Sequence, residues 1–516
     1  MTCSAVNKKS VFNQLFIRES VVFALTVIFF GYFAFLGFDL HHDGVMLFPA
    51  VRVAEGGVVF RDAFCQYGLL VPLLQGVAVA LFGAEMIVIR LLTVLFYGGS
   101  AVLLDLLWKR FLPPKLSVFV PVMFLVYAPC IMVTFHSWSS VYALFFMLLY
   151  ALFMVRYWER DPSSCRELFF AGVSAGLVWS CRAPCGAVTV FAAILILLGL
   201  NWFCGKDKKM ILLESSYFFA GAAAVALLAL GYIFISGAWS DFVLQNFNYV
   251  ADFAYGRGSR GSWQYFCDSM FPFYQEDLAY FNSMFAVMPL AAMILLYMKV
   301  RSGILDGKEE MRRFMPLAAL LILGLGSWHQ YYPVPCVRHL FWGGVPLFGA
   351  YLLALSELWK KRTFFRVSAC VILIFIALIT LVPRGIGIFH RLDLHKRPTA
   401  DVPSIRYLRL TRHEEQLVQM LLNWEEQGRR AGLAKFVNWT EDSLITLMLK
   451  PSGFRDRQFY RISNSPYRDY DNKIVKHITE NPSMVLLDHD TFVPGFVKYA
   501  DFEYVGKPYY LFVPSK

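Results

Sequence analysis

Long apolar runs separated by short polar segments fill the chain up to about residue 383. A membrane span requires about 20 apolar residues, and by this criterion the runs predict about eleven membrane-spanning helices. They lie at residues 21–38, 87–108, 116–134, 141–155, 168–181, 183–203, 217–236, 281–298, 314–326, 340–358 and 367–382. The run at 69–82 is shorter and contains Pro72 near its start, so it is predicted to be a helix on the outer surface of the membrane.

The positions of the cations predict the orientation of these helices. Lys and Arg gather in the cytoplasmic loops of membrane proteins, and with the N-terminus inside, most cations before residue 384 fall on the inner side. The predicted outer segments hold Arg52, Arg61, Arg182, Arg257, Arg260 and Arg338. Counting the run at 69–82 as a span would reverse every later loop and remove this asymmetry. The C-terminus is therefore predicted to lie outside.

The pattern changes to that of a soluble domain from about residue 384. Thr411 and Glu414 form a capping-box sequence that opens a helix running to about residue 430, and Gly432 ends it. Runs typical of β-strands follow at 435–439, 484–488 and 509–513. We therefore predict a transmembrane domain at 1–383, with an outer first loop at 38–86, and a small α/β domain at 384–516 on the outer face.

Composition supports a polytopic α-helical membrane protein. Of 516 residues, 58% are hydrophobic and 16% charged, whereas soluble domains have roughly 45–50% and about 25%. The mean hydropathy is +0.52. These values exclude a disordered chain, a collagen-like fibre and an ordinary soluble enzyme. Although the net charge is +11, the cations flank apolar runs, so membrane lipids rather than nucleic acid are the expected partners.

Polar residues concentrate in the first outer loop, close to the predicted membrane boundary. Ionisable groups at this depth cost several kcal/mol unless they are paired or face water. The loop contains Asp39, His41, His42, Asp43, Arg61, Asp62, Gln66 and Tyr67. They could form an interfacial cap of solvated charges, but their number in one loop, among apolar neighbours, indicates a cavity at the outer leaflet.

The order of features in residues 38–100 resembles a known family. An acidic residue just past the first span precedes a helical run at 45–54, a glycine turn at 56–57, an interfacial helix ending at 81–83 and Arg90 near the start of the next span. This order is similar to the first outer loop of GT-C fold glycosyltransferases. Their relatives include the protein O-mannosyltransferases and the aminoarabinose transferases of lipid A.

The resemblance implies a GT-C-like fold and a transferase that uses a polyprenyl-phosphate sugar donor. The acceptor would be a hydroxyl of a lipid, a cell-surface glycan or a protein, at the periplasmic face of a bacterial cytoplasmic membrane. Many relatives carry Asp-Glu where this chain has Asp43-Gly44, and His136 and Ser137 occupy a loop where some relatives have another acidic residue. A two-carboxylate metal site is therefore not predicted, although Asp43 and His42 could hold a divalent cation; no other cofactor is expected.

The transfer would require a base for the hydroxyl proton and cations for the departing phosphate. We predict Asp43 as the base, because a carboxylate at an apolar boundary gains proton affinity, and one direct displacement would invert the anomeric carbon. The predicted groups for donor phosphate or substrate are Arg338, His339, Arg182, Arg61, Asp62, His42, Gln66 and Tyr67. Arg90 is interpreted as structural, although Asp105 and Glu85 are poorly spaced as its partners.

Other interpretations remain open for several of these features. Arg182 could simply reach the interface from the end of a span, and the aromatic residues at 327–339 could belong to an interfacial belt. The glycine-rich stretch around Arg257 and Arg260 is expected to be a flexible connection, and residues 488–490 a solvated strand end.

The alternative function is a membrane transporter or lipid flippase. Transporters show paired half-repeats and polar residues near mid-span, whereas here the polar residues cluster on the outer side. A polysaccharide polymerase or ligase would share the transferase chemistry. The order of features in residues 38–100 favours a transferase that receives its donor from the outer leaflet.

Overall fold

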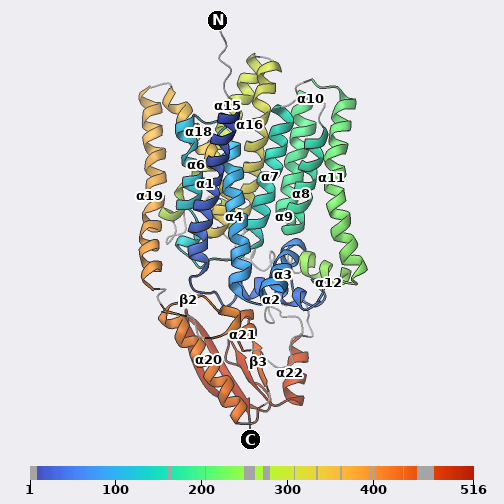
Figure 1. Cartoon of the computed structure of the whole chain (residues 1–516), viewed down its shortest axis with the longest axis vertical. Helices are drawn as coiled ribbons and strands as arrows, with labels where there is room; N and C mark the ends of the chain where they lie inside the picture. The colour runs from blue at the N-terminus through green and yellow to red at the C-terminus, as the bar shows by residue number, and fades with distance from the viewer. Residues whose placement is uncertain are drawn as a thin grey trace.

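The computed structural model consists of a helical bundle with a small mixed α/β domain at one end (Figure 1). The structure describes residues 8–159, 165–203, 205–248, 262–270, 279–306, 308–332, 335–360, 363–394, 397–398, 401–433, 435–449 and 470–515.

Seven stretches of helix in the described part of the chain are long and apolar enough to cross a membrane. They lie in α1 (Lys8–Ala34), α4 (Met86–Trp108), α7 (Ser139–Glu159), α11 (Lys208–Ile235), α15 (Ala279–Asp306), the joined α17 (Val337–Gly344) and α18 (Phe348–Lys360), and α19 (Phe364–Leu394). The predicted polytopic helical class is thereby confirmed.

Four further predicted spans coincide with helices that lie alongside these in the bundle (Figure 1). They are α6 (Phe119–Val126), α8 (Cys165–Cys181), α9 (Ala183–Ile194) and α16 (Lys308–Ser327). A short π-helix at Leu195–Leu200 continues α9 into α10 (Asn201–Phe203). These helices are shorter or less apolar than the other seven, so the total of about eleven spans stays a prediction.

Two helices of the first loop lie at the end of the bundle next to the C-terminal domain (Figure 1). They are α2 (His42–Ala54) and α3 (Leu70–Phe82). α3 occupies the run that was predicted to be a surface helix, and it ends at Gly83, whose φ of 109° favours glycine. The start of α1 lies at the end of the bundle opposite the C-terminal domain (Figure 1), as an odd number of crossings requires.

The C-terminal domain is built around a four-stranded sheet. Its order is β3 (Lys435–Trp439), β4 (Ser483–Leu487), β6 (Lys507–Pro514), β5 (Phe496–Tyr504), with β3 and β4 parallel and the other pairs antiparallel. The capping box of Thr411 and Glu414 is present at the start of α20 (Arg412–Arg430). The sequence did not predict β5, α21 (Ser443–Met448) or α22 (Tyr470–Glu480). α19 extends to Leu394, so the two parts of the chain join beyond residue 383.

The C-terminal domain binds the first loop directly. Arg409, in the short strand β2 (Arg409–Leu410) that pairs with β1 (Arg397–Pro398), exchanges backbone hydrogen bonds with Phe35 and Gly37. The Leu444 amide of α21 donates to the Leu40 carbonyl. A Cβ atom on Gly44 would lie 2.2 Å from the Leu444 nitrogen, so the absence of a side chain there lets α2 and α21 touch. The loop between α1 and α2 is thus held from both sides.

Candidate functional site

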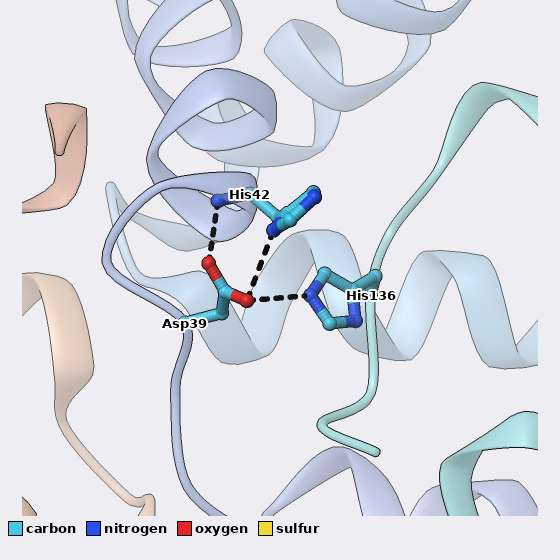
Figure 2. A group of neighbouring side chains, drawn as sticks. All are labelled: Asp39, His42 and His136. Atoms are coloured by element: carbon cyan, nitrogen blue, oxygen red, sulfur yellow. Dashed lines mark hydrogen bonds and ion pairs between the residues drawn. The ribbon is translucent and has the colours of Figure 1, made fainter. Parts of the chain in front are cut away.

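Asp39 is the centre of a polar cluster at the start of α2. Its Oδ1 accepts hydrogen bonds from the backbone amides of His41 and His42, which fixes the carboxylate at the beginning of the helix. Its Oδ2 lies 2.9 Å from Nδ1 of His42 and 3.4 Å from Nε2 of His136 (Figure 2). The cluster therefore joins the first loop to the segment before α7. The side chain of Asp39 remains 27% exposed to solvent.

The electrostatics of the cluster keep Asp39 ionised. Burial alone raises the pKa of its carboxyl, but the hydrogen bonds and charges of His136 and His42 outweigh burial and hold that pKa well below its ordinary value. Burial, together with the positive charge of Arg338, lowers the pKa of His136 to about 3. At neutral pH the cluster thus combines a carboxylate anion with a neutral imidazole at His136.

Asp43, four residues further on, has a different environment. Its side chain is fully buried, and its Oδ2 lies 2.7 Å from Nη2 of Arg90, which is also fully buried. Burial raises the pKa of the Asp43 carboxyl, and the Arg90 guanidinium offsets part of this increase. Nη1 of Arg90 donates to the carbonyls of Ala34 and Gly37. The ion pair therefore fastens the turn between α1 and α2, and this geometry favours a structural role for Asp43 over the predicted role of base.

The structural interpretation of Arg90 also depends on this pair. Neither carboxylate considered from the sequence is its partner: Asp105 binds Arg18, and Glu85 binds Arg406 of the C-terminal domain. Asp43 and Arg90 are 47 positions apart, so their contact could not be predicted from the spacing of residues along one helix.

Aromatic rings connect the Asp39 cluster to three of the predicted substrate-binding residues. The His42 ring lies 5.2 Å from the ring of Trp138, which lies 5.1 Å from that of Tyr67. The guanidinium of Arg182 stands over the Tyr67 ring and also binds the hydroxyl of Ser140. Gln66 donates to the Tyr67 hydroxyl. The predicted residues His42, Gln66, Tyr67 and Arg182 are thus brought together.

A small pocket lies beside this chain of rings. Gln66 and Tyr67 line it together with Val45, Met46, Pro72 and Gln75. Gln75 is buried and donates to the backbone of Ser137 and to the Tyr142 hydroxyl. The pocket therefore has apolar walls from α2 and α3 and an amide at its polar side.

The turn after α16 and the start of α17 add further basic residues to this side of the bundle. Arg338 is close enough to His136 to lower its pKa. Burial, with the charges of Arg182 and His339 adding to it, lowers the pKa of His329 to about 4. Nε2 of His329 lies 3.8 Å from the Cys185 sulfur in α9. Arg182 and His339 thus act on His329, and Arg338 acts on His136.

The predicted residues Arg61 and Asp62 lie elsewhere in the loop. They form an ion pair with each other at 2.9 Å, and Nη1 of Arg61 donates to the Ser236 carbonyl at the end of α11. Asp62 also accepts from the Val58 amide. Their contacts in the described structure stabilise the loop rather than the Asp39 cluster.

Two other features were singled out from the sequence. Arg257 and Arg260 lie outside the described residues. At the end of β4, Asp488 accepts from the Glu441 amide and contacts Lys507, and His489 contacts Asp488. This strand end is therefore tied into its own domain.

Asp39 and His136 are the functional candidates that sequence reasoning did not select. The spacing of Asp39 and His42 was a signal that could have been used, since three positions bring side chains together where a helix begins. His136 gave no comparable signal, because it lies 97 positions from Asp39.

Comparisons with known proteins identify the fold. No protein-family model and no curated protein matches the sequence. Among solved structures, the chain is similar to the crystal structure of ArnT from Cupriavidus metallidurans bound to undecaprenyl phosphate, with a TM-score of 0.52 and 12% sequence identity, over 98% of each chain. The chain therefore has the fold of ArnT, and the predicted GT-C-like fold is confirmed over 98% of the chain.

Proposed function

We propose that this protein is a GT-C-type glycosyltransferase that moves a sugar from a polyprenyl-phosphate donor to an acceptor hydroxyl. The observation that carries the proposal is the full-length likeness to ArnT, whose crystal structure contains undecaprenyl phosphate. The acceptor is a lipid, a cell-surface glycan or a protein. Transfer takes place at the end of the bundle that holds α2 and α3, which we assign to the periplasmic side of a bacterial cytoplasmic membrane.

Cations around the Asp39 cluster are assigned to the donor phosphate. Arg offers a planar fork that matches two phosphate oxygens, and Arg182 and Arg338 approach the cluster from different elements. His339 lies beside Arg338 at the start of α17. The rings of Tyr67 and Trp138 supply flat apolar surfaces for the sugar or the first isoprene units.

Asp39 replaces Asp43 as the proposed base. Its carboxylate is ionised and partly exposed, whereas that of Asp43 is fully buried against Arg90. The acceptor oxygen forms a bond to the anomeric carbon, the bond from that carbon to the phosphate oxygen breaks, and polyprenyl phosphate leaves with the bonding electrons. The hydroxyl proton passes to Asp39, and the single displacement inverts the anomeric carbon.

A weakly basic carboxylate is sufficient for this role. Glycosyl transfer passes through a transition state with oxocarbenium-ion character. The attacking hydroxyl therefore becomes acidic only as the new bond forms, and the proton leaves late. The low pKa of Asp39 then ensures that the carboxylate is ready to accept it throughout the physiological range.

The proposal is tested with the full-length protein in liposomes, supplied with labelled undecaprenyl-phosphate sugars and a membrane extract as the source of acceptor. We expect label transfer and release of undecaprenyl phosphate by the wild type, and loss of both in Asp39→Asn. Asp62→Asn is the matched control, because this carboxylate belongs to the same loop and has a similar exposure of 28%.

The remaining outcomes would contradict part or all of this proposal. Transfer that persists in Asp39→Asn but disappears in a folded Asp43→Asn variant would return the role of base to Asp43. Movement of labelled lipid across the bilayer without any sugar transfer would identify a transporter or flippase instead.

A further inference from the structure

We propose that Asp39, His42 and His136 form a binding site for a divalent first-row cation of the Zn²⁺ type. Nδ1 of His42 and Nε2 of His136 both face Oδ2 of Asp39 (Figure 2), and these three atoms lie within 4.8 Å of one another. Two ligands come from one turn at the start of α2 and the third from the segment before α7. Cation binding does not rest on the proposed sugar transfer.

Both ring nitrogens of His136 face acceptor oxygens. Its Nδ1 faces the Thr134 carbonyl, and because a carbonyl oxygen only accepts, Nδ1 carries the hydrogen. Nε2 of the neutral ring then presents a lone pair to Oδ2 of Asp39, which is also an acceptor, at 3.4 Å. Two acceptors in this position repel each other unless a cation or a proton lies between them.

The side chain of His136 is only 2% exposed. A metal ion can bind the lone pair of a neutral imidazole and the charge of the carboxylate at the same time.

The distances match those between ligands of one ion. Zn²⁺ binds imidazole nitrogen and carboxylate oxygen at about 2.0–2.2 Å, so two ligands in a tetrahedral site lie roughly 3.4 Å apart. In the cluster, Oδ2 of Asp39 lies 2.9 Å from Nδ1 of His42 and 3.4 Å from Nε2 of His136. Small side-chain movements would therefore complete the coordination.

Surrounding groups orient the ligands as an outer shell does at metal sites. Oδ1 of Asp39 accepts from two backbone amides, and Nδ1 of His136 is held by the Thr134 carbonyl. The side chains of Asp39 and His42 are 27% and 34% exposed, which leaves room for a fourth ligand from solvent or substrate. Three protein ligands and one open position are typical of a catalytic rather than a structural zinc site.

The ligand types select the class of ion. Mg²⁺ and Ca²⁺ prefer oxygen ligands, whereas two imidazoles and one carboxylate suit Zn²⁺ and its first-row neighbours. A cation here would lower the pKa of a coordinated hydroxyl. With the cation bound, Oδ2 of Asp39 would be a ligand, and the cation rather than a free Asp39 carboxylate would activate the acceptor hydroxyl.

The experiment measures metal binding by the full chain in detergent. After chelator treatment and dialysis, Zn²⁺ is titrated by calorimetry, bound metal is quantified by mass spectrometry, and Co²⁺ is added as a spectroscopic probe of ligand geometry. We expect one equivalent per chain and visible Co²⁺ absorption typical of a nitrogen–oxygen site. His136→Ala and Asp39→Asn should each weaken Zn²⁺ binding at least a hundredfold.

His413→Ala is the matched control, because this exposed histidine of α20 is remote from the cluster and its removal should change nothing. If His136→Ala does not give folded protein, His42→Ala decides, since its side chain is partly exposed. Absence of a Zn²⁺ site in the wild type, or unchanged binding in the folded cluster variants, would overturn the proposal.

Discussion

Asp39 and Asp43 lie one helical turn apart, yet the structure gives their carboxylates opposite environments. Asp39 is 27% exposed and contacts two histidines, whereas Asp43 is fully buried and contacts one arginine. Asp43 also accepts a hydrogen bond from the Asp39 backbone amide, and a buried charge held in this way can fix a fold but cannot reach a substrate. A partly exposed charge between imidazoles can do chemistry. Candidate catalytic residues in such a loop are therefore distinguished by partners and access, not by proximity to the membrane boundary.

The largest expected effect is on the rate of sugar transfer, which should depend on Asp39. Asp39→Asn should reduce sugar transfer by roughly 10²–10⁴-fold, the usual contribution of a general base. The midpoint of thermal unfolding should change little, because the amide still accepts the two backbone hydrogen bonds. Transfer rates with a labelled donor and unfolding curves of the same preparation measure both quantities. A variant that unfolds before it loses activity would contradict this division of roles.

A second variant tests whether the ion pair of Asp43 and Arg90 stabilises the fold. Arg90→Ala leaves the Asp43 carboxylate buried without its partner, and breaking such a pair costs about 3–5 kcal/mol. We expect a markedly lower free energy of unfolding, measured by denaturant titration in detergent. Replacing both residues with leucine should recover part of the loss, since no buried charge then remains. Full stability of Arg90→Ala together with complete loss of transfer would instead indicate a catalytic role for the pair.

A third pair of variants compares two outer arginines. Arg182→Ala removes a charged group assigned to the donor phosphate, and such hydrogen bonds contribute about 1.5–3 kcal/mol. The KM for the donor should therefore rise roughly 10- to 100-fold. Arg61→Ala should leave the KM unchanged, because Arg61 binds Asp62 and the end of α11. Equal effects of the two substitutions would indicate that the phosphate site is misplaced.

The smallest expected effect is a dependence of stability on pH. The folded protein holds the pKa of His329 at about 4, below the ordinary value of about 6.5. Neutral His329 contributes to the free energy of unfolding, and this contribution is fully present above pH 6.5. It is lost as the pH falls from 6.5 towards 4, because in that range the unfolded chain binds more protons than the folded protein. His329→Gln should flatten the decline of the unfolding midpoint across this range. His413→Gln is the control, and an identical decline in both variants would count against the assignment.

The sequence by itself determined the architecture, because the relevant signals are local. Each apolar run is long enough to predict its own helix, and the charges between the runs predict the orientation. The capping box of Thr411 and Glu414 and the apolar run at 484–488 likewise specify their elements without help from distant residues. The order of features in residues 38–100 was sufficient to indicate the GT-C-like fold.

Only the tertiary structure decided which polar residues act together. Asp43 pairs with Arg90 in α4, 47 positions away in the sequence, and Asp39 contacts His136, 97 positions away. The sequence led to Asp43 as the predicted base and not to Asp39, because desolvation and partner choice depend on elements that pack from elsewhere. The C-terminal domain also contributes to this environment, because α21 packs against Gly44, next to Asp43. The assembled fold buries one carboxylate against Arg90 and leaves the other partly exposed beside two histidines.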